Sequence, residues 1–280
     1  MKRLSTNVRD GLAIILALVL SVVLTASGLL VSLKTTIFFE NFIIEQIEDV
    51  DYAFYVQEYF MEVVESKAIL YGVDADYLNE PFTQAKMKED IFGSTRMLFD
   101  RQTPDFFVEE LEDDIKAHLI DYAKDHNITL TIEVEAGIDE LTQALVKDYT
   151  RIMQVPLFKN FVDVKEIFDR VFWIALSGLL VFAGVILWML MRLYQNKHRG
   201  LRMISHTTSA AGLMSLVLLV PLYVSRFYER IQIRPRFFNL LLAEIIESAL
   251  GVSILIALGW FVVSGILIYS SEHARSLIKK

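Results

Sequence analysis

The sequence contains no cysteine. Disulfide bonds, thiolate catalysis and cysteine-ligated metal sites are therefore excluded. A domain exported without disulfides must be held together by its core, which is more typical of a bacterial envelope than of an animal cell surface. Histidine is also scarce, with five residues. Two of these, His118 and His126, would lie roughly 12 Å apart on a helix, which is too far for them to share a metal ion.

The common catalytic signatures are also missing. The chain has no His-Glu-x-x-His zinc motif, no Gly-x-Ser-x-Gly nucleophile elbow and no phosphate loop. The densest acidic cluster comprises Glu109, Glu110, Glu112, Asp113 and Asp114. We interpret this cluster as a solvated helix face, with weak calcium binding as the alternative. The sequence therefore predicts a protein that is not an enzyme and that uses no cofactor.

Charge is missing from four long apolar stretches, which contain no Asp, Glu, Lys or Arg. They cover residues 12–33, 171–191, 203–224 and 249–269. The apolar core of a bilayer is about 30 Å thick and requires about 20 apolar residues to cross it as a helix. Only structures that satisfy their own backbone hydrogen bonds are stable there. The fold class predicted is an integral membrane protein with a bundle of four transmembrane helices.

The net charge of −8 conceals a strong asymmetry along the chain. Residues 34–170 contain 13 Lys and Arg against 30 Asp and Glu, a net charge of −17, and the remaining residues carry +9. An acidic domain lacks the basic footprint that nucleic-acid binding requires. We therefore expect the partners to include the lipid bilayer and to exclude nucleic acid.

Positive residues accumulate at the cytoplasmic ends of membrane spans. Ten Lys and Arg lie in or beside the amino terminus, residues 192–202 and the tail, against four in residues 225–248. We predict a multi-pass protein of a cell membrane, most typical of bacteria, with both termini cytoplasmic and the acidic domain outside. The predicted segments are a cytoplasmic amino terminus (1–11), transmembrane helices (12–33, 171–191, 203–224 and 249–269), an extracytoplasmic acidic domain (34–170), a cytoplasmic basic loop (192–202), an outer basic amphipathic loop (225–248) and a cytoplasmic tail (270–280).

The first span shares features with a cleaved signal peptide. A basic head precedes an apolar run, and the small residues Ala26, Ser27 and Gly28 follow it. The apolar run continues through Leu33, and this total length favours an uncleaved anchor. Cleavage would leave three spans.

The acidic domain is predicted to be mostly helical, with one minor β element. Apolar residues recur every three or four positions over residues 37–71, and Gly72 is a typical helix stop. Further helices are predicted over 82–99, 103–126 and 139–153. Residues 128–134 instead alternate apolar and polar side chains, which predicts a strand that pairs with an unidentified segment or a second chain. A capping box at Asp163 and Glu166 predicts a helix that continues into the second span.

Small residues recur at every fourth position of two spans. The first span carries Ala13, Ala17, Ser21 and Thr25, and the fourth carries Ala249, Ser253 and Ala257. Such faces allow helix backbones to approach closely in lipid. We interpret them as helix-packing surfaces. The alternative is a small-residue path for a substrate, which would lack the intramembrane charges of ion pathways.

Residues 225–248 form a basic, amphipathic segment. Its candidate binding residues are Arg226, Arg230, Arg234, Arg236, Glu244 and Glu247. The arginines alternate with aromatic and aliphatic residues, a pattern typical of an interfacial segment. They would anchor the protein on lipid phosphates, dock the acidic domain, or hold an anionic lipid or envelope polymer.

The order of segments resembles that of cell-division and efflux permeases of the FtsX and MacB type, in topology alone. We expect a non-enzymatic envelope protein whose outer domain binds a partner protein or envelope ligand in a receptor, accessory or signal-relay role. The alternative is a transporter subunit or lipid-handling permease. A membrane or envelope protein is the expected partner, and a second copy of the chain is a further one.

Overall fold

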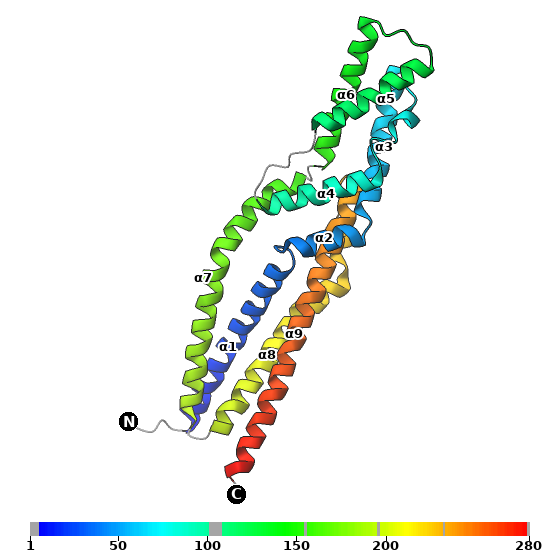
Figure 1. Cartoon of the computed structure of the whole chain (residues 1–280). Coiled ribbons are helices and arrows are strands. Elements are labelled where there is room, and N and C mark those ends of the chain that lie inside the picture. The colour runs from blue at the N-terminus through cyan, green and yellow to red at the C-terminus, as the bar shows by residue number, and fades with distance from the viewer. Residues whose placement is uncertain (1–5, 101–107, 154–155, 195–196, 232, 279–280) are drawn as a thin grey trace. The chain divides into compact units, whose positions relative to one another are not determined.

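The computed structural model describes residues 6–100, 108–153, 156–194, 197–231 and 233–278 (Figure 1). Over these ranges the chain forms nine α-helices and two short 3-10 helices, and no strand occurs in them. The chain divides into two compact units. We call the first the membrane unit: Met1–Phe39, Ile167–Gln232 and Leu242–Lys280. The second, the inter-span domain, comprises Glu40–Glu166 and Ile233–Leu241.

Four helices are long and apolar enough to cross a membrane. They are α1 (Thr6–Thr35), α7 (Pro156–Leu193), α8 (Lys197–Ser225) and α9 (Arg236–Ile278). The parts that meet the length and composition of a span are Val8–Thr35, Asp163–Leu193, His198–Ser225 and Arg236–His273. Each contains one of the four apolar stretches predicted from the sequence.

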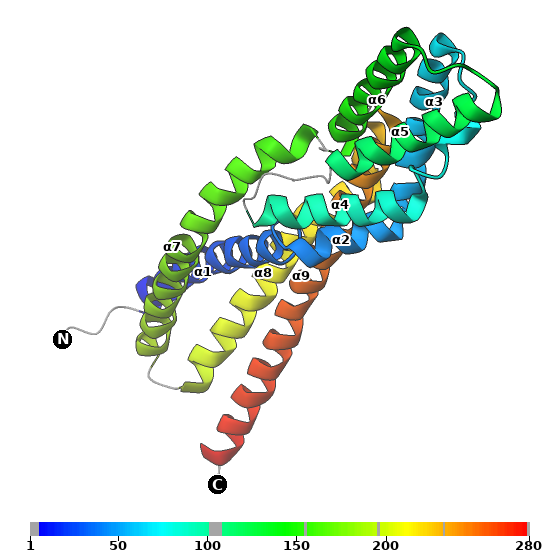
Figure 2. The ribbon, with the colours of Figure 1, turned by 45° about the horizontal axis from the view of Figure 1, so that its top comes forward.

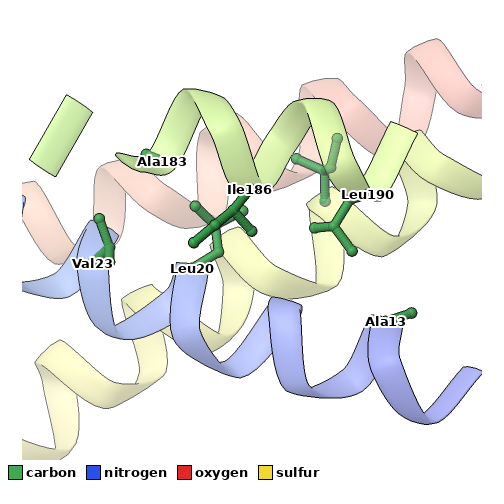
Figure 3. Packing of buried hydrophobic residues seen from close by; sticks show 7 residues of the cluster. Ala13, Leu20, Val23, Ala183, Ile186 and Leu190 are labelled. Atoms are coloured by element: carbon green, nitrogen blue, oxygen red, sulfur yellow. The ribbon is translucent and has the colours of Figure 1, made fainter. Parts of the chain in front are cut away.

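The core of the membrane unit lies where α1, α7 and α8 meet. Leu20 of α1 and Ile186 of α7 lie together between their helices (Figure 3). The other buried members of this cluster are Ala13, Val23, Ala183, Leu190 and Ile204. Most other large apolar side chains of these helices are exposed, as expected for helices that face lipid rather than water.

The inter-span domain is built from five α-helices and the short 3-10 helix η1, together with residues 233–241 (Figures 1 and 2). The helices are α2 (Glu40–Asp49), α3 (Tyr52–Tyr71), α4 (Gln84–Phe99), α5 (Val108–Asp125) and α6 (Ile132–Met153), and η1 covers Ala75–Leu78. The centre of the core is aromatic. The ring of Phe60 lies 4.8 Å from that of Phe82 and 5.4 Å from that of Tyr149, between centroids.

The helix predicted over residues 37–71 is interrupted. It ends at Asp49 and restarts at Tyr52, because Asp51 adopts a left-handed conformation with φ of 50°. Aspartate tolerates this region better than most residues, because its short polar side chain bonds locally. The stop predicted at Gly72 is confirmed. Gly72 is left-handed with φ of 68°, and its N–H bonds to the carbonyls of Ala68 and Ile69.

The strand predicted over residues 128–134 is wrong. α5 ends at Asp125, the left-handed Asn127 (φ 54°) turns the chain, and α6 already begins at Ile132. The hydroxyl of Thr131 accepts a hydrogen bond from the N–H of Val134, as an N-cap does. Only six residues, 126–131, are left between the two helices. Alternation over so short a stretch reflects a capped connection and not a pleated strand.

Other helices differ from their predicted bounds. α6 begins seven residues before the predicted Asp139, and α9 begins within the predicted outer loop, at Arg236. The predicted continuity between the acidic domain and the second span is confirmed, because α7 is one helix from Pro156 to Leu193. The first residues of the helix predicted over 103–126 lie outside the described residues.

Candidate functional site

The candidate site is a groove that we call the α5–α6 groove. It lies where the end of α3 meets the end of α5 and the start of α6, within the inter-span domain. The hydroxyl of Tyr122 donates to the carbonyl of Gly72 over 2.9 Å, which ties α5 to the end of α3. The ring of Tyr122 also lies 5.0 Å from that of Tyr77 and 4.2 Å from that of His126, between centroids. These contacts connect α5 to the end of α3 and to η1.

The groove is lined almost entirely by apolar side chains and encloses about 250 Å³. Its lining residues are Tyr71, Gly72, Val73, Leu119, Tyr122, Ala123, Ile128, Glu133, Val134, Gly137, Ile138 and Leu141. Gly137 helps to keep it open, since a methyl group there would come within 4.0 Å of the Tyr71 ring.

Large apolar side chains are exposed in the groove and beside it in the chain. Ile132 is 83% exposed and Leu70 is 80% exposed, while Ile69, Ile128 and Leu130 are also exposed. In the spans, exposed apolar residues are explained by lipid. In the inter-span domain they need another explanation, because soluble surfaces rarely leave several such side chains together uncovered.

Acidic side chains lie on the first part of α6, in the groove lining and next to it in the chain. Glu133, Glu135, Asp139 and Glu140 are all exposed on the first part of this helix. Hydrogen bonds from its own backbone N–H and from the Thr131 hydroxyl lower the pKa of Glu133 below its ordinary value, so this carboxylate is ionised at neutral pH. Asp139 also pairs with Lys116 at 3.1 Å. Of these acids only Glu133 lines the groove, and it gives the border of the groove on α6 a negative charge.

In the predicted acidic cluster on α5, two side chains form ion pairs and the other three are exposed. Glu112 pairs with Lys116 at 2.9 Å, and Asp114 pairs with Lys86 at 3.4 Å. Glu109, Glu110 and Asp113 are exposed. Within the described ranges no group of three or more acidic or histidine side chains is arranged to hold a metal ion.

The arginines of residues 225–248 are divided between the two units. Arg226 and Arg230 belong to the membrane unit, whereas Arg234 and Arg236 belong to the inter-span domain. All four are exposed, and Arg226 pairs with Glu229 at 3.2 Å.

The two glutamates predicted beside them, Glu244 and Glu247, are half-buried on α9. The hydroxyl of Tyr223 on α8 donates to Glu247 over 3.5 Å. Glu244 accepts a hydrogen bond of the same length from the hydroxyl of Ser248, one turn further along α9.

The predicted small-residue faces of α1 and α9 lie partly at helix contacts. Ala13, Ser21, Thr25, Ala249 and Ala257 are buried, and Ala17 and Ser253 are half-buried. Two of them bond across helices. Thr25 donates to the carbonyl of Ala211 on α8 over 3.1 Å, and Ser253 lies 2.6 Å from Ser32 of α1, between hydroxyl oxygens.

A further polar seam joins α8 to α9 and was not predicted. The hydroxyls of Ser205 and Ser264 lie 2.8 Å apart, and Ser209 donates to Ser264 over 2.7 Å. Each of these hydroxyls has a partner in the neighbouring helix. Such mutual bonding joins helices in lipid, and it does not favour a substrate path along α8.

Sequence reasoning also missed the residues of the α5–α6 groove. Ile69 and Leu70 extend the apolar pattern of their helix beyond one face. These additional apolar residues were the feature of the sequence that could have indicated a binding surface. Ile128, Leu130 and Ile132 were recognised as a distinct pattern but assigned to a strand. Ile128 lies with Tyr71 in the groove because tertiary contacts bring together segments some sixty residues apart in the chain.

The four long apolar helices make this chain a multi-pass membrane protein. Its inter-span domain is a helical unit of its own. Comparison with family models, with curated proteins and with solved structures finds no match for this chain.

Proposed function

We propose that this protein is a non-enzymatic component of a cell envelope whose inter-span domain lies outside the membrane and binds a partner protein at the α5–α6 groove. The observation that carries the proposal is the apolar lining of that groove, together with the exposure of Leu70 and Ile132, which neighbour the groove residues Tyr71 and Glu133 in the chain. Burying such side chains against a partner contributes roughly 25 cal/mol per Å² of apolar surface.

The chemistry of the groove indicates the kind of segment that would bind. An apolar floor selects apolar side chains, and the acidic border on α6 selects positive charge beside them. We infer a partner that presents a short apolar segment flanked by Lys or Arg. Complementary charge of this sort would act mainly on the rate of association and on specificity.

The membrane helices would anchor the domain and would transmit whether a partner is bound to it. The supporting observation is the continuity of α7, which contains both residues of the inter-span domain and a candidate span without a break. A continuous helix transmits a rotation or tilt better than a flexible linker does. This role would require a further partner to supply any cytoplasmic output.

The proposal is tested by crosslinking in intact cells. A photoreactive residue is placed at Ile132 or Leu70 in the full chain, and the captured species are identified by mass spectrometry. The matched control carries the same residue at Lys124, an exposed position on α5. We expect both Ile132 and Leu70, and not Lys124, to capture one and the same protein. The purified captured protein should then bind the full chain.

A substitution inside the groove shows whether the capture is specific. Val134→Glu places a charge on the groove lining, where Val134 is half-buried. It should abolish capture from Leu70, whereas Lys124→Glu should leave that capture unchanged. Capture of lipid alone, or equal capture from all three positions, contradicts the proposal. Capture of lipid alone would instead support the alternative function, that of a lipid-handling permease.

A further inference from the structure

The inter-span domain contains a second cavity, separate from the α5–α6 groove, that we call the aromatic cavity. It is bounded by α3, by the last turns of α6 and by residues 233–238, all of which belong to this domain. Its volume is about 450 Å³. Pockets that hold small organic ligands span roughly 300–1,000 Å³, so this cavity is large enough for one.

One wall of the cavity is formed by aromatic rings. The ring of Phe237 lies 5.5 Å from that of Tyr52 and 5.4 Å from that of Tyr59, between centroids. Phe237 and Tyr52 are buried, while Tyr59 is partly exposed at 38%. Such a wall favours a flat or branched apolar body, because ring faces pack well against both.

The charged side chains of the cavity leave positive charge uncompensated. Asp148, Arg151 and Arg234 all line it. Asp148 is paired with Lys67 at 2.9 Å, whereas neither arginine has an ion-pair partner among the residues that the structure describes. Two guanidinium groups beside an apolar wall are suited to binding an anionic group. Each guanidinium can donate two parallel hydrogen bonds to such a group.

A buried hydroxyl in the same wall also lacks a partner. Tyr52 is 1% exposed, and its hydroxyl makes no hydrogen bond to the described part of the chain. Burial raises the pKa of Tyr52 well above its ordinary value, so the hydroxyl stays protonated and can donate. Buried polar groups without partners are uncommon and call for an explanation. This one belongs to a residue of the cavity wall, although its oxygen has almost no surface open to the cavity itself.

We propose that the aromatic cavity binds an organic anion, with its carboxylate or phosphate group held by Arg151 and Arg234 and its apolar body packed on Tyr59 and Phe237. A soluble anion and the head of an anionic lipid share this chemistry. The site involves none of the residues of the α5–α6 groove and does not depend on the proposed function. It unites one arginine from the segment predicted to bind anions with another, Arg151, that the sequence did not single out.

The test uses the full chain in nanodiscs of phosphatidylcholine, with 1-naphthyl phosphate as the probe. Binding is followed by the fluorescence anisotropy of the naphthyl group, with empty nanodiscs as the blank. We expect saturable binding of one probe per chain. The double variant Arg151→Gln/Arg234→Gln should weaken it by at least about tenfold, which corresponds to about 1.4 kcal/mol.

Three controls make the result interpretable. Arg226→Gln/Arg230→Gln removes two equally exposed arginines outside the cavity and should leave binding unchanged. Arg151→Lys/Arg234→Lys keeps the charge and should retain part of the binding, which shows that charge rather than folding is responsible. Val134→Glu in the α5–α6 groove should have no effect, so failure of this site and failure of the proposed function are distinguishable.

The outcomes that overturn the proposal are equally definite. They are the absence of saturable binding to the wild-type chain, or equal affinity in the two glutamine double variants once thermal melting has shown that both fold. Adding phosphatidylglycerol to the nanodiscs distinguishes the source of the ligand. Displacement of the probe identifies an anionic lipid, and undiminished binding identifies a soluble anion.

Discussion

At the scale of single residues, His118 is the side chain whose contacts depend most directly on its protonation. Its Nδ1 lies 2.8 Å from the carbonyl oxygen of Asp114, and its Nε2 lies 3.2 Å from a carboxylate oxygen of Glu80. Both neighbours are acceptors, so both nitrogens donate only when the ring is protonated. Burial lowers the pKa of His118, but the bonds to Asp114 and Glu80 outweigh it and leave the pKa above its ordinary value.

This contact predicts a pH-dependent stability. A histidine with a raised folded pKa stabilises the fold fully below its unfolded pKa of about 6.5 and loses that contribution as the pH rises through the folded pKa. The groups facing the ring are Glu80 and Asp114, the latter also paired with Lys86. We expect His118→Gln to lower the melting temperature of the full chain at pH about 5.5 and to have little effect at pH about 8.5.

The matched control is His126→Gln, which removes an exposed histidine directly after the end of the same helix. Its effect should vary less with pH, because His126 bonds the Tyr122 carbonyl and not a carboxylate. A constant difference between His118→Gln and the wild-type chain at both pH values would contradict the assignment.

Gly212 provides a second prediction at the residue scale. A methyl group at this position of α8 would lie 2.7 Å from the Phe261 ring and 2.9 Å from the Ala257 carbonyl oxygen of α9. Because one of these atoms is backbone, the helices themselves must move. We expect Gly212→Ala to lower the free energy of unfolding by about 1–3 kcal/mol, the usual cost of overpacking. Unfolding of the purified protein in mixed detergent micelles measures it.

Gly259 on α9 is the control for this substitution, since a methyl group there meets no atom within 4 Å. Gly259→Ala should be neutral or stabilise the helix by up to about 1 kcal/mol. Equal losses of stability from the two substitutions would show that α8 and α9 do not approach closely at Gly212.

At the scale of elements, the inter-span domain is stabilised by hydrogen bonds between polar side chains on different helices. Tyr149 of α6 is 1% exposed, and its hydroxyl donates to the carboxylate of Asp90 on α4. Burial raises the pKa of Asp90 above its ordinary value, and the Tyr149 bond lowers it by a smaller amount. The bond therefore stabilises the ionised carboxylate at a partly buried position and connects α4 to α6.

Removal of this bond should destabilise the domain. We expect Tyr149→Phe to lower the free energy of unfolding by about 1–3 kcal/mol at neutral pH, because it leaves the Asp90 carboxylate without this donor. The loss should shrink at acidic pH as Asp90 becomes protonated. Tyr77→Phe is the control, since it removes an exposed hydroxyl that bonds Asp125 over 3.3 Å. Its effect should stay within about 0.5 kcal/mol. Equal effects would contradict the role of the Asp90 bond.

At the scale of the whole molecule, the distribution of charge predicts an orientation across the membrane. The segment of residues 192–202 is basic and short, and the domain between the first two spans is acidic and large. The positive-inside rule therefore assigns them to opposite sides of the membrane. The four candidate spans are consistent with that assignment, because an even number of crossings returns the chain to its starting side.

The absence of native cysteine makes the topology directly measurable, since single cysteines can be labelled without a background. We expect Leu70→Cys to react with a membrane-impermeant maleimide in intact cells and Arg199→Cys to react only after permeabilisation. Both positions are exposed, so access to the side chain is not limiting. The opposite pattern would reverse the topology, and it would also remove the proposed partner site from the outside of the cell.

Much of this architecture could be predicted from the sequence by itself. Uncharged runs of about 20 residues must be helical in lipid, so the four spans follow from local composition. The stop at Gly72 follows from the conformational freedom of glycine. The acidic character of the inter-span domain follows from counting its charges. Each of these properties belongs to a residue and its near neighbours in the chain.

Only the tertiary structure decided the rest, because it depends on contacts between distant segments. Ile128–Val134 alternates as a strand does, but the caps at Asn127 and Thr131 and the packing of α6 place it between two helices. The α5–α6 groove brings Tyr71 beside Gly137, and the aromatic cavity brings Tyr52 beside Phe237. No local pattern encodes such pairs, since the free energy of packing depends on which surfaces meet when the chain folds.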